Sequence, residues 1–569
     1  MMPELPNPSL VPFVVSVTGH RDLRSQDLDS LRHEVRSVFS GFRKRMPSTP
    51  MILLSGLAEG ADQLVAEVAL EQKVFLAAVL PMPLDLYRVQ MPDQAQKQLD
   101  DLLARSTLKI QLSLEGRMAE EIRTSEEARA TCYDTLARFL ARQGQALIAL
   151  WDGVESQKPG GTSIVVGYVR SGRLDPGNDE AETRCGAVYH IVTPRRSGIE
   201  PAPVIRTLPL DGKAAAARGF VANLLEENLE RFNRASSKLP RREVSVHANL
   251  IEETNLPLTP FLERLQTLYR QADAISLLAN RKRRIYLAMI LLTAVVGTLF
   301  YGIHGEMFPE QIWLWFGFPF FVIAAVLLYR AARANHVEEK YLDARALAEA
   351  LRVQFFWELA GIRQSVDQYY LMNHRTELDW IRFALKNVWL LSQGTDEFST
   401  AASHYPVVLE KWVRDQANWY RLKAGEQSQI VRRRQRVSRY GLLVAVAWSI
   451  LVPTTLLILR SLHLLPSWNN GSKLTERIYQ GCHVALALPA LLAGAYRLWI
   501  EQAGYEEQSR EYSYMERQFS HIAKELEAHL DSPEEADKLL LALGIEALSE
   551  NGRWLLLHRE RPLEVLSTP

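Results

Sequence analysis

The stretch LLSGLAEGADQLVAEVAL, from Leu53 to Leu70, joins a short apolar run, a turn of small residues and a helix-like segment. Strand, turn and helix in this order open many nucleotide-binding domains, because such a turn lets a phosphate approach the start of the helix. Further on, the same chain carries four uncharged apolar runs of membrane length. These two features raise the question of how a turn suited to phosphate and apolar runs of membrane length act together in one chain.

Short apolar runs alternate with polar, helix-length segments from residue 11 to residue 205. The runs are mostly uninterrupted, as expected for strands buried on both faces of a sheet. The predicted strands are Phe13–Val17, Met51–Leu54, Val74–Leu80, Leu108–Leu112, Ala146–Trp151 and Val188–Val192. The predicted helices include Leu28–Arg45, Gln94–Arg105 and Glu126–Arg142. This alternation predicts an α/β, Rossmann-like, doubly wound parallel sheet with helices on both faces.

Length and composition limit the class of function. The chain has 569 residues, which suggests about three or four units. Lys+Arg and Asp+Glu both number 66, so the charge balance gives no support to nucleic acid binding. Cys132, Cys185 and Cys482 are too widely spaced for a metal-ligand pair or a disulfide framework, which fits a reducing compartment. The N-terminus lacks the pattern of a signal peptide.

The strand signals stop at about residue 206, and an all-helical region is predicted to follow. Lys213–Leu239 and Phe261–Asn280 are predicted helices, and Thr259-Pro260 is a start signal for the second. Runs of 18 or 19 residues without Lys, Arg, Asp or Glu then occupy Ile285–Ile303, Ile312–Tyr329, Gly441–Leu459 and Ile478–Tyr496. Each nearly spans a hydrocarbon core about 30 Å thick, so four transmembrane helices in two hairpins are predicted.

Basic residues flank these runs mainly on one side of the predicted membrane. That side holds Arg281, Lys282, Arg283, Arg284, Arg330, Arg333, Arg432, Arg433, Arg434, Arg436, Arg439 and Arg497. The opposite loops hold Arg460, Lys473 and Arg477. The positive-inside rule therefore predicts an inner-membrane protein with both termini in the cytoplasm. Nucleic acid contact is the alternative for the basic clusters, but their position favours a topology signal or anionic lipid contact.

The membrane region is also predicted to be duplicated. Matching residues stand in the same order in both copies, namely Tyr269/Tyr420, Arg281/Arg432, Tyr329/Tyr496 and Glu338/Glu506. Each copy reads as a polar helix, a basic belt, two spans and a long charged helix. The charged helices, Val337–Leu359 and Tyr505–Leu530, are amphipathic and are expected to pack on other subunits or only within their own subunit.

Two turns at the ends of predicted strands are candidates for phosphate contact. The first is Thr18-Gly19-His20-Arg21, where the glycine lets backbone approach a phosphate and Arg21 can form paired hydrogen bonds to it. The second contains Ser55, Gly56, Glu59, Gly60 and Asp62. Its glycines allow a tight turn, and Asp62 either contacts a ligand or caps the following helix. The second turn matches neither GxGxxG nor a P-loop.

A third turn follows Trp151 and contains Asp152, Gly153 and Lys158 before Gly160-Gly161-Thr162. Backbone N–H groups and a hydroxyl at a helix start form an anion cradle, and Lys158 adds positive charge. The carboxyl ends of parallel strands meet at one edge of a sheet. The three turns are therefore expected to face one crevice.

Four motifs in order, TGHR, SGLAEGAD, LPMPLDLY and WDG…KPGGTS, resemble the SLOG family of Rossmann-like domains. The resemblance covers residues 11–205 and implies binding of a nucleotide or nucleotide-derived signal. It adds Pro81 and Tyr87 to the expected ligand contacts. The C-terminal part is similar in architecture to SLATT-type transmembrane effectors, which usually have one two-helix hairpin where two are predicted here. This second likeness implies a role in antiphage defence.

Enzymatic relatives of the LOG branch carry PGGxGTxxE, whose glutamate serves catalysis. Here Pro159-Gly160-Gly161-Thr162 lacks the second glycine-threonine step and the acid. Glu59 and Asp152 have no paired carboxylate, so they are predicted ligand contacts and no catalytic residue is predicted. The chain has no HExxH, CxxC or GxSxG motif, and neither a metal site nor a resident cofactor is predicted.

The sequence thus predicts a sensor of a nucleotide second messenger that oligomerises and permeabilises the membrane or conducts ions. Its expected partners are this nucleotide, the lipid bilayer and further copies of the chain, but not nucleic acid. The alternatives are a membrane-anchored nucleotide hydrolase and a scaffold that binds no ligand. The predicted parts are a sensing domain at 11–205, a helical linker at 206–280, membrane modules at 281–362 and 432–532, a connector at 363–431 and a helical tail at 533–569.

Overall fold

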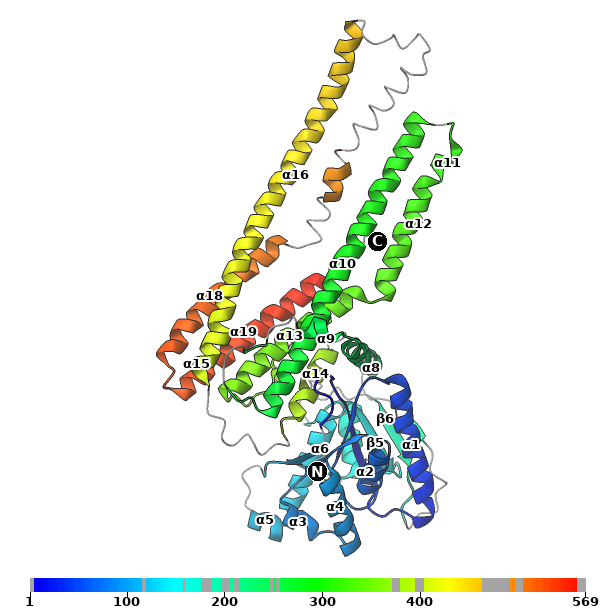
Figure 1. Ribbon diagram of the computed structural model, residues 1–569. Helices are drawn as coiled ribbons and strands as arrows, with labels where there is room; N and C mark the ends of the chain where they lie inside the picture. The colour runs from blue at the N-terminus through cyan, green and yellow to red at the C-terminus, as the bar shows by residue number, and fades with distance from the viewer. Residues whose placement is uncertain are drawn as a thin grey trace. The chain divides into compact units, whose positions relative to one another are not determined.

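A computed structural model describes residues 5–114, 119–156, 159–174, 187–196, 205–208, 215–245, 249–251, 256–308, 310–370, 379–393, 404–462, 489, 491–496 and 505–559. The chain divides into two compact units, and each is assembled from segments that are separate in the sequence (Figure 1). The first comprises Met1–Ala274 and Ala346–Ser403, and the second comprises Ile275–Arg345 and His404–Pro569.

The first unit is built on a seven-stranded sheet with the order β4-β3-β2-β1-β5-β6-β7. The strands are β1 (Phe13–Gly19), β2 (Met51–Ser55), β3 (Phe75–Leu80), β4 (Leu108–Gln111), β5 (Ala146–Trp151), β6 (Val188–Val192) and β7 (Ile205–Leu208). The pairings from β4 through β6 are all parallel, and β7 pairs antiparallel with β6. The predicted α/β parallel sheet is confirmed, with each of the six predicted strands present.

β7 was not among the predicted strands, and it extends to Leu208, just past residue 206, where the strand signals stop. β7 has only four residues and includes Arg206 and Thr207, so it lacks the continuous apolar run that marks the buried strands. Its position at the edge of the sheet explains this composition, since an edge strand is less enclosed than a central one.

Helices connect the strands, and they are α1 (Leu28–Arg45), α2 (Ala61–Glu71), α3 (Leu84–Arg88), α4 (Asp93–Arg105), α5 (Ala119–Thr124), α6 (Glu126–Gln143) and α7 (Thr162–Ser171). The central strands β1, β2 and β5 are buried along their lengths except at Gly19. The chain builds β2, β3 and β4 on one side of β1 and then places β5 on the other side. The strand order therefore reverses between β1 and β5.

Segments from much later in the chain complete the first unit. In α8 (Ala215–Ser237), Asn233 Nδ2 donates to Val11 O at 2.8 Å, and Asn233 Oδ1 accepts from Val11 N–H at 2.9 Å. In α14 (Asp379–Leu390), the amide of Asn387 exchanges two hydrogen bonds of 2.8 Å with the amide of Gln145. Leu390 belongs to the same buried cluster as residues of β1 and β2, so α14 is part of the core of the sheet.

The remaining described elements are helical. The long ones are α10 (Pro260–Met307), α12 (Gly317–Ala334), α13 (Val337–Ala360), α16 (Asp415–Ser461), α18 (Tyr505–Ala528) and α19 (Pro533–Arg559). The short ones are α9 (Arg241–Ser245), α11 (Ile312–Trp315), α15 (Tyr405–Val408), the 3-10 turns η1 (Ser25–Asp27) and η2 (Val366–Gln368), and the π-helical turn η4 (Leu409–Arg414). Helices α13 and α18, which follow the two predicted hairpins, have the same length of 24 residues.

Three described helices are long and apolar enough to cross a membrane, namely Pro260–Gly305, Ile312–Ala360 and Tyr405–Leu459. Four spans were predicted, and the described residues contain three; most of the predicted run Ile478–Tyr496 lies outside them. The predicted helix end at Asn280 was wrong, because α10 continues into the first apolar run. No glycine or proline interrupts the sequence there, and Arg and Lys are good helix formers.

Candidate functional site

A cavity of about 490 Å³ lies at the carboxyl ends of β1, β2 and β5. Its walls come from all three turns predicted to bind phosphate, together with one face of α6. This is the place where the strand order reverses, and doubly wound sheets bind ligands in the crevice at such a point. The volume falls within the range of roughly 300–1,000 Å³ that is typical of small-molecule sites.

The structure divides the predicted site residues into three groups. Those that line the cavity are Thr18, Gly19, His20, Arg21, Asp62, Tyr87, Gly160, Gly161 and Thr162. Those outside its lining are Ser55, Gly56, Glu59, Gly60, Pro81, Asp152 and Gly153. Lys158 lies outside the described residues. Several members of the second group shape the turns whose other residues reach the cavity.

Gly60 allows the first two turns to meet. Its φ is +87°, and a Cβ at this position would lie 2.4 Å from the carbonyl oxygen of Arg21. Beside it, Ala61 N–H donates to His20 O at 3.0 Å, which joins the start of α2 to the end of β1. A side chain at residue 60 would therefore push the TGHR turn away from α2, and the left-handed backbone there favours glycine.

Asp62 lies in the first turn of α2 and is only 8% exposed. Its Oδ2 accepts a hydrogen bond of 3.4 Å from Ala58 N–H, so the carboxyl group helps to close the second turn. Burial raises the pKa of Asp62 to about 7, although this hydrogen bond and the charge of Arg21 oppose the rise. The prediction that Asp62 caps α2 was wrong, because Gly60 is the N-cap residue and the Asp62 carboxyl bonds to Ala58 N–H before the helix. The same side chain lines the cavity, and its contact with a ligand stays a prediction.

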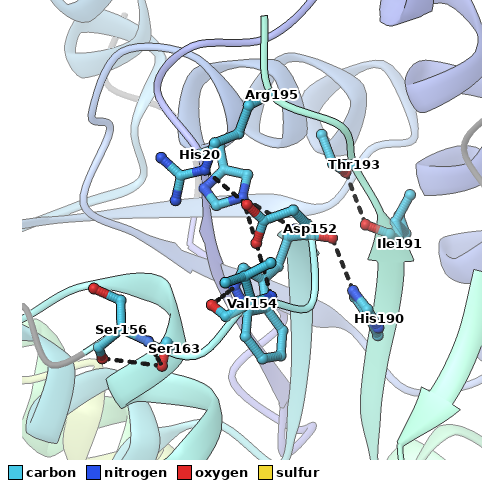
Figure 2. A network of polar contacts seen from close by, with 10 residues as sticks. His20, Asp152, Val154, Ser156, Ser163, His190, Ile191, Thr193 and Arg195 are labelled. Carbon is cyan, nitrogen blue, oxygen red and sulfur yellow. Dashed lines mark hydrogen bonds and ion pairs between the residues drawn. The ribbon is translucent and has the colours of Figure 1, made fainter. Parts of the chain in front are cut away.

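Asp152 ties together three segments at the rim of the sheet, as Figure 2 shows. Its backbone N–H donates to His20 Nε2 at 3.0 Å, and its Oδ2 accepts from Arg195 Nε at 2.7 Å. Its Oδ1 accepts from Val154 N–H at 3.0 Å, which shapes the turn after β5. Burial opposes ionisation, but the hydrogen bonds from Arg195 and from Val154 N–H, together with the nearby positive charge, outweigh it and lower the pKa of Asp152. Asp152 therefore holds the rim together from outside the cavity lining.

The imidazole of His20 is neutral in this arrangement. Its Nε2 accepts a hydrogen bond of 3.0 Å from Asp152 N–H and lies 3.2 Å from Asp152 Oδ1. Burial lowers the pKa of His20 against the opposing charge of Asp152. Neutral His20 can donate or accept hydrogen bonds in the cavity, but it does not supply the positive charge that would attract a phosphate.

The glycine pair before α7 forms the part of the cavity best suited to an anion. Gly160 has a φ of +68°, and a Cβ on it would lie 2.4 Å from Tyr133 Cβ. No side chain caps the N-terminus of α7, where Gly161 is the capping residue. Ser163 Oγ accepts from Ser156 N–H at 3.0 Å and so fixes the approach to the helix. Gly161 and Thr162 present the start of a ten-residue helix to the cavity.

The sequence analysis missed the wall formed by α6. Its lining residues are Glu126, Arg129, Ala130, Tyr133, Leu136, Ala137 and Leu140. They recur every three or four residues, so they share one face of the helix. This mixture of aromatic, charged and apolar side chains on one face was the available signal. Gln90 and Arg195 also line the cavity and were not predicted.

The three arginines that line the cavity differ in how they are held. Arg195 pairs with Asp152, and Arg129 Nη1 donates to two backbone carbonyls, of Ile122 and Arg123, at 3.1 Å each. The guanidinium of Arg21 lies over the ring of Tyr133, 5.4 Å from its centroid, and pairs with no carboxylate in the described part of the chain. Arg21 is therefore the cavity arginine best placed to bind an anion.

The described residues contain no group of three or more His, Cys, Asp or Glu side chains able to hold a metal ion. The chemistry that these residues offer is backbone and arginine contact to an anion, next to aromatic and apolar surface. In comparisons with known proteins, no family model and no curated protein matches the chain.

Proposed function

We propose that the α/β unit is a sensor that binds a nucleotide-derived ligand, and that binding controls a membrane effector formed by the long apolar helices. The observation that carries the proposal is the cavity at the strand-order reversal, where the glycine pair before α7 and Arg21 line the same space. An N-terminal helix turn and a guanidinium together suit a phosphate. Tyr87, Tyr133 and Leu136 add apolar surface for a base or sugar.

The proposed effector is an oligomer in the inner membrane, with both termini in the cytoplasm. The three described helices of membrane length support a membrane location, and the basic flanks support the orientation. The sequence resemblance to SLOG and SLATT domains supports a role in antiphage defence. To shift the equilibrium between inactive and active states from 1:99 to 99:1, a ligand must bind the active state more tightly by about 5.5 kcal/mol. Phosphate contacts repeated across the subunits of an oligomer are a suitable source of this free energy.

Purified full-length protein, in detergent and in dye-loaded liposomes, tests the proposal. The intact chain is needed because α14 belongs to the core of the sheet. We expect at least one of a panel of cyclic nucleotides, nucleotide monophosphates and NAD-derived nucleotides to bind without turnover and to release the dye. Binding of none of them contradicts the sensor. Dye release without any ligand, or no release with a ligand that binds, contradicts the proposed coupling between ligand binding and the membrane effector.

A membrane-anchored nucleotide hydrolase is the second candidate. The observation that favours it is Asp62, a buried cavity carboxyl whose pKa of about 7 suits a general acid or base. In that case the full-length protein would turn over a bound nucleotide, and Asp62→Asn would abolish turnover while leaving binding in place. In the sensor, the same substitution would change only the pH dependence of binding.

That pH dependence has a definite sign. Asp62 is largely neutral below its pKa of about 7 and ionised above it, so a rise from pH 6 to pH 8 adds a negative charge beside the bound anion. The affinity for a ligand that keeps one charge over this range, such as cyclic AMP, should fall about 3- to 10-fold. Asp62→Asn should remove the fall, whereas the control Asp100→Asn on the exposed surface of α4 should retain it. An unchanged fall in Asp62→Asn contradicts this role, and titration calorimetry at both pH values makes the measurement.

A further inference from the structure

Tyr133 of α6 contacts several walls of the cavity, yet no sequence motif singled it out. Its ring lies under the guanidinium of Arg21, and its backbone lies against Gly160, where a Cβ would meet Tyr133 Cβ at 2.4 Å. Its hydroxyl donates to Gln90 Oε1 at 2.8 Å, which fixes the ring from the far end. The ring centroid is also 6.3 Å from that of Tyr87. One side chain thus joins the first turn, the third turn and the segment after α3.

The contact with Arg21 matters most for ligand binding. An exposed arginine samples many rotamers, and a ligand must hold one of them to form paired hydrogen bonds. A guanidinium that rests on an aromatic face is already restricted, and its N–H edge remains available. The other two cavity arginines are held by a carboxylate or by backbone carbonyls, whereas Arg21 is held by Tyr133, through its ring and through a side-chain hydrogen bond to its hydroxyl.

We propose that Tyr133 is a positioning residue that holds Arg21 ready to bind a phosphate group of the ligand. This inference rests on the proposed function, and it identifies Arg21 and Tyr133 as the pair that selects phosphorylated ligands over their nucleosides. The ring orients the cation, while Gly160 and the start of α7 approach the same space from the side of the third turn. Loss of the ring should therefore weaken binding of the phosphate more than binding of the nucleoside.

Titration calorimetry on the full-length protein in detergent tests the pair, with AMP, inorganic phosphate and adenosine as probes. Tyr133→Leu should weaken AMP and phosphate binding about tenfold and leave any adenosine binding within about twofold. Tyr133→Phe keeps the ring but loses the hydroxyl contacts to Arg21 and Gln90, so it should recover part of the lost affinity. In an Arg21→Gln background, Tyr133→Leu should have almost no further effect, because the two residues act through one contact.

Tyr168→Leu is the matched control. Arg138 lies over the ring of Tyr168 at the same centroid distance of 5.4 Å, and this pair also joins α6 to α7, but neither residue lines the cavity. Loss of the Tyr168 ring should leave the affinity for AMP unchanged.

If Tyr133→Leu weakens the binding of AMP and of adenosine equally, or if the effects of Tyr133→Leu and Arg21→Gln add, the positioning role is overturned but the proposed function is not. If the wild-type protein binds neither AMP nor phosphate but binds another phosphorylated ligand from the panel, that ligand and its nucleoside serve as the probes in place of AMP and adenosine. If it binds no phosphorylated ligand, both the proposed function and this inference fail.

Discussion

Gly161→Asp should reduce the affinity for a phosphorylated ligand by about 100-fold or more, without destabilising the protein. The new carboxylate would stand at the N-terminus of α7, where the proposed phosphate binds, and would repel it. The backbone tolerates the change because Gly161 has a φ of −72°. Asp is also a favourable residue at a helix N-cap, so stability should remain within about 0.5 kcal/mol of the wild-type value.

Gly161→Asn separates the charge from the size of the side chain. Asn also caps helices and has nearly the same shape, so it should weaken binding much less than Asp. Titration calorimetry gives the affinities, and thermal unfolding checks that both variants are folded. If Gly161→Asp binds the ligand as tightly as the wild-type protein, the turn before α7 is not the binding site.

Gly60→Ala should destabilise the α/β unit by about 2–4 kcal/mol. The substitution places a Cβ in a backbone with a φ of +87° and 2.4 Å from the carbonyl oxygen of Arg21. That oxygen belongs to the backbone, so it cannot move aside as the end of a flexible side chain would. We expect a lower thermal unfolding midpoint and faster hydrogen exchange in β1, β2 and α2.

Gly167→Ala provides the comparison for this prediction. Gly167 lies in α7 and is exposed, and among the described residues a Cβ added to it would meet no atom within 4 Å apart from the adjacent residues and backbone of its own helix. Alanine favours a helix over glycine by about 0.5–1 kcal/mol, so this variant should be as stable as the wild-type protein or slightly more stable. Equal stability of Gly60→Ala and Gly167→Ala would show that the TGHR turn can move without loss of folding stability.

The central strands were predictable because burial on both faces requires continuous apolar residues. β5 and β6 begin and end where the sequence predicted, at Ala146–Trp151 and Val188–Val192. β7 was not predictable in this way, because its short stretch contains Arg206 and Thr207. The end of the helix before the first span was misplaced for a related reason, since a run of charges marks a membrane boundary but does not end a helix.

The turns of the candidate site were predictable, but the wall that faces them was not. Glycines after apolar runs identify turns, and the rule for parallel sheets places them at one edge. The mixed face of α6 was the one local signal, and it does not show that this face meets those turns, because the packing of the helix on the sheet decides it. Arg195 pairs with Asp152 across 43 positions of sequence, and Asn387 pairs with Gln145 across 242. Contacts at such separations leave no pattern in a single sequence.

The place of α14 in the first unit has a consequence for biosynthesis. The amide pair of Asn387 and Gln145 and the burial of Leu390 form only after the ribosome has made the first predicted hairpin, which lies earlier in the chain. That hairpin therefore leaves the ribosome while the sheet still lacks its last helix. The nascent α/β unit therefore remains incomplete until α14 has left the exit tunnel.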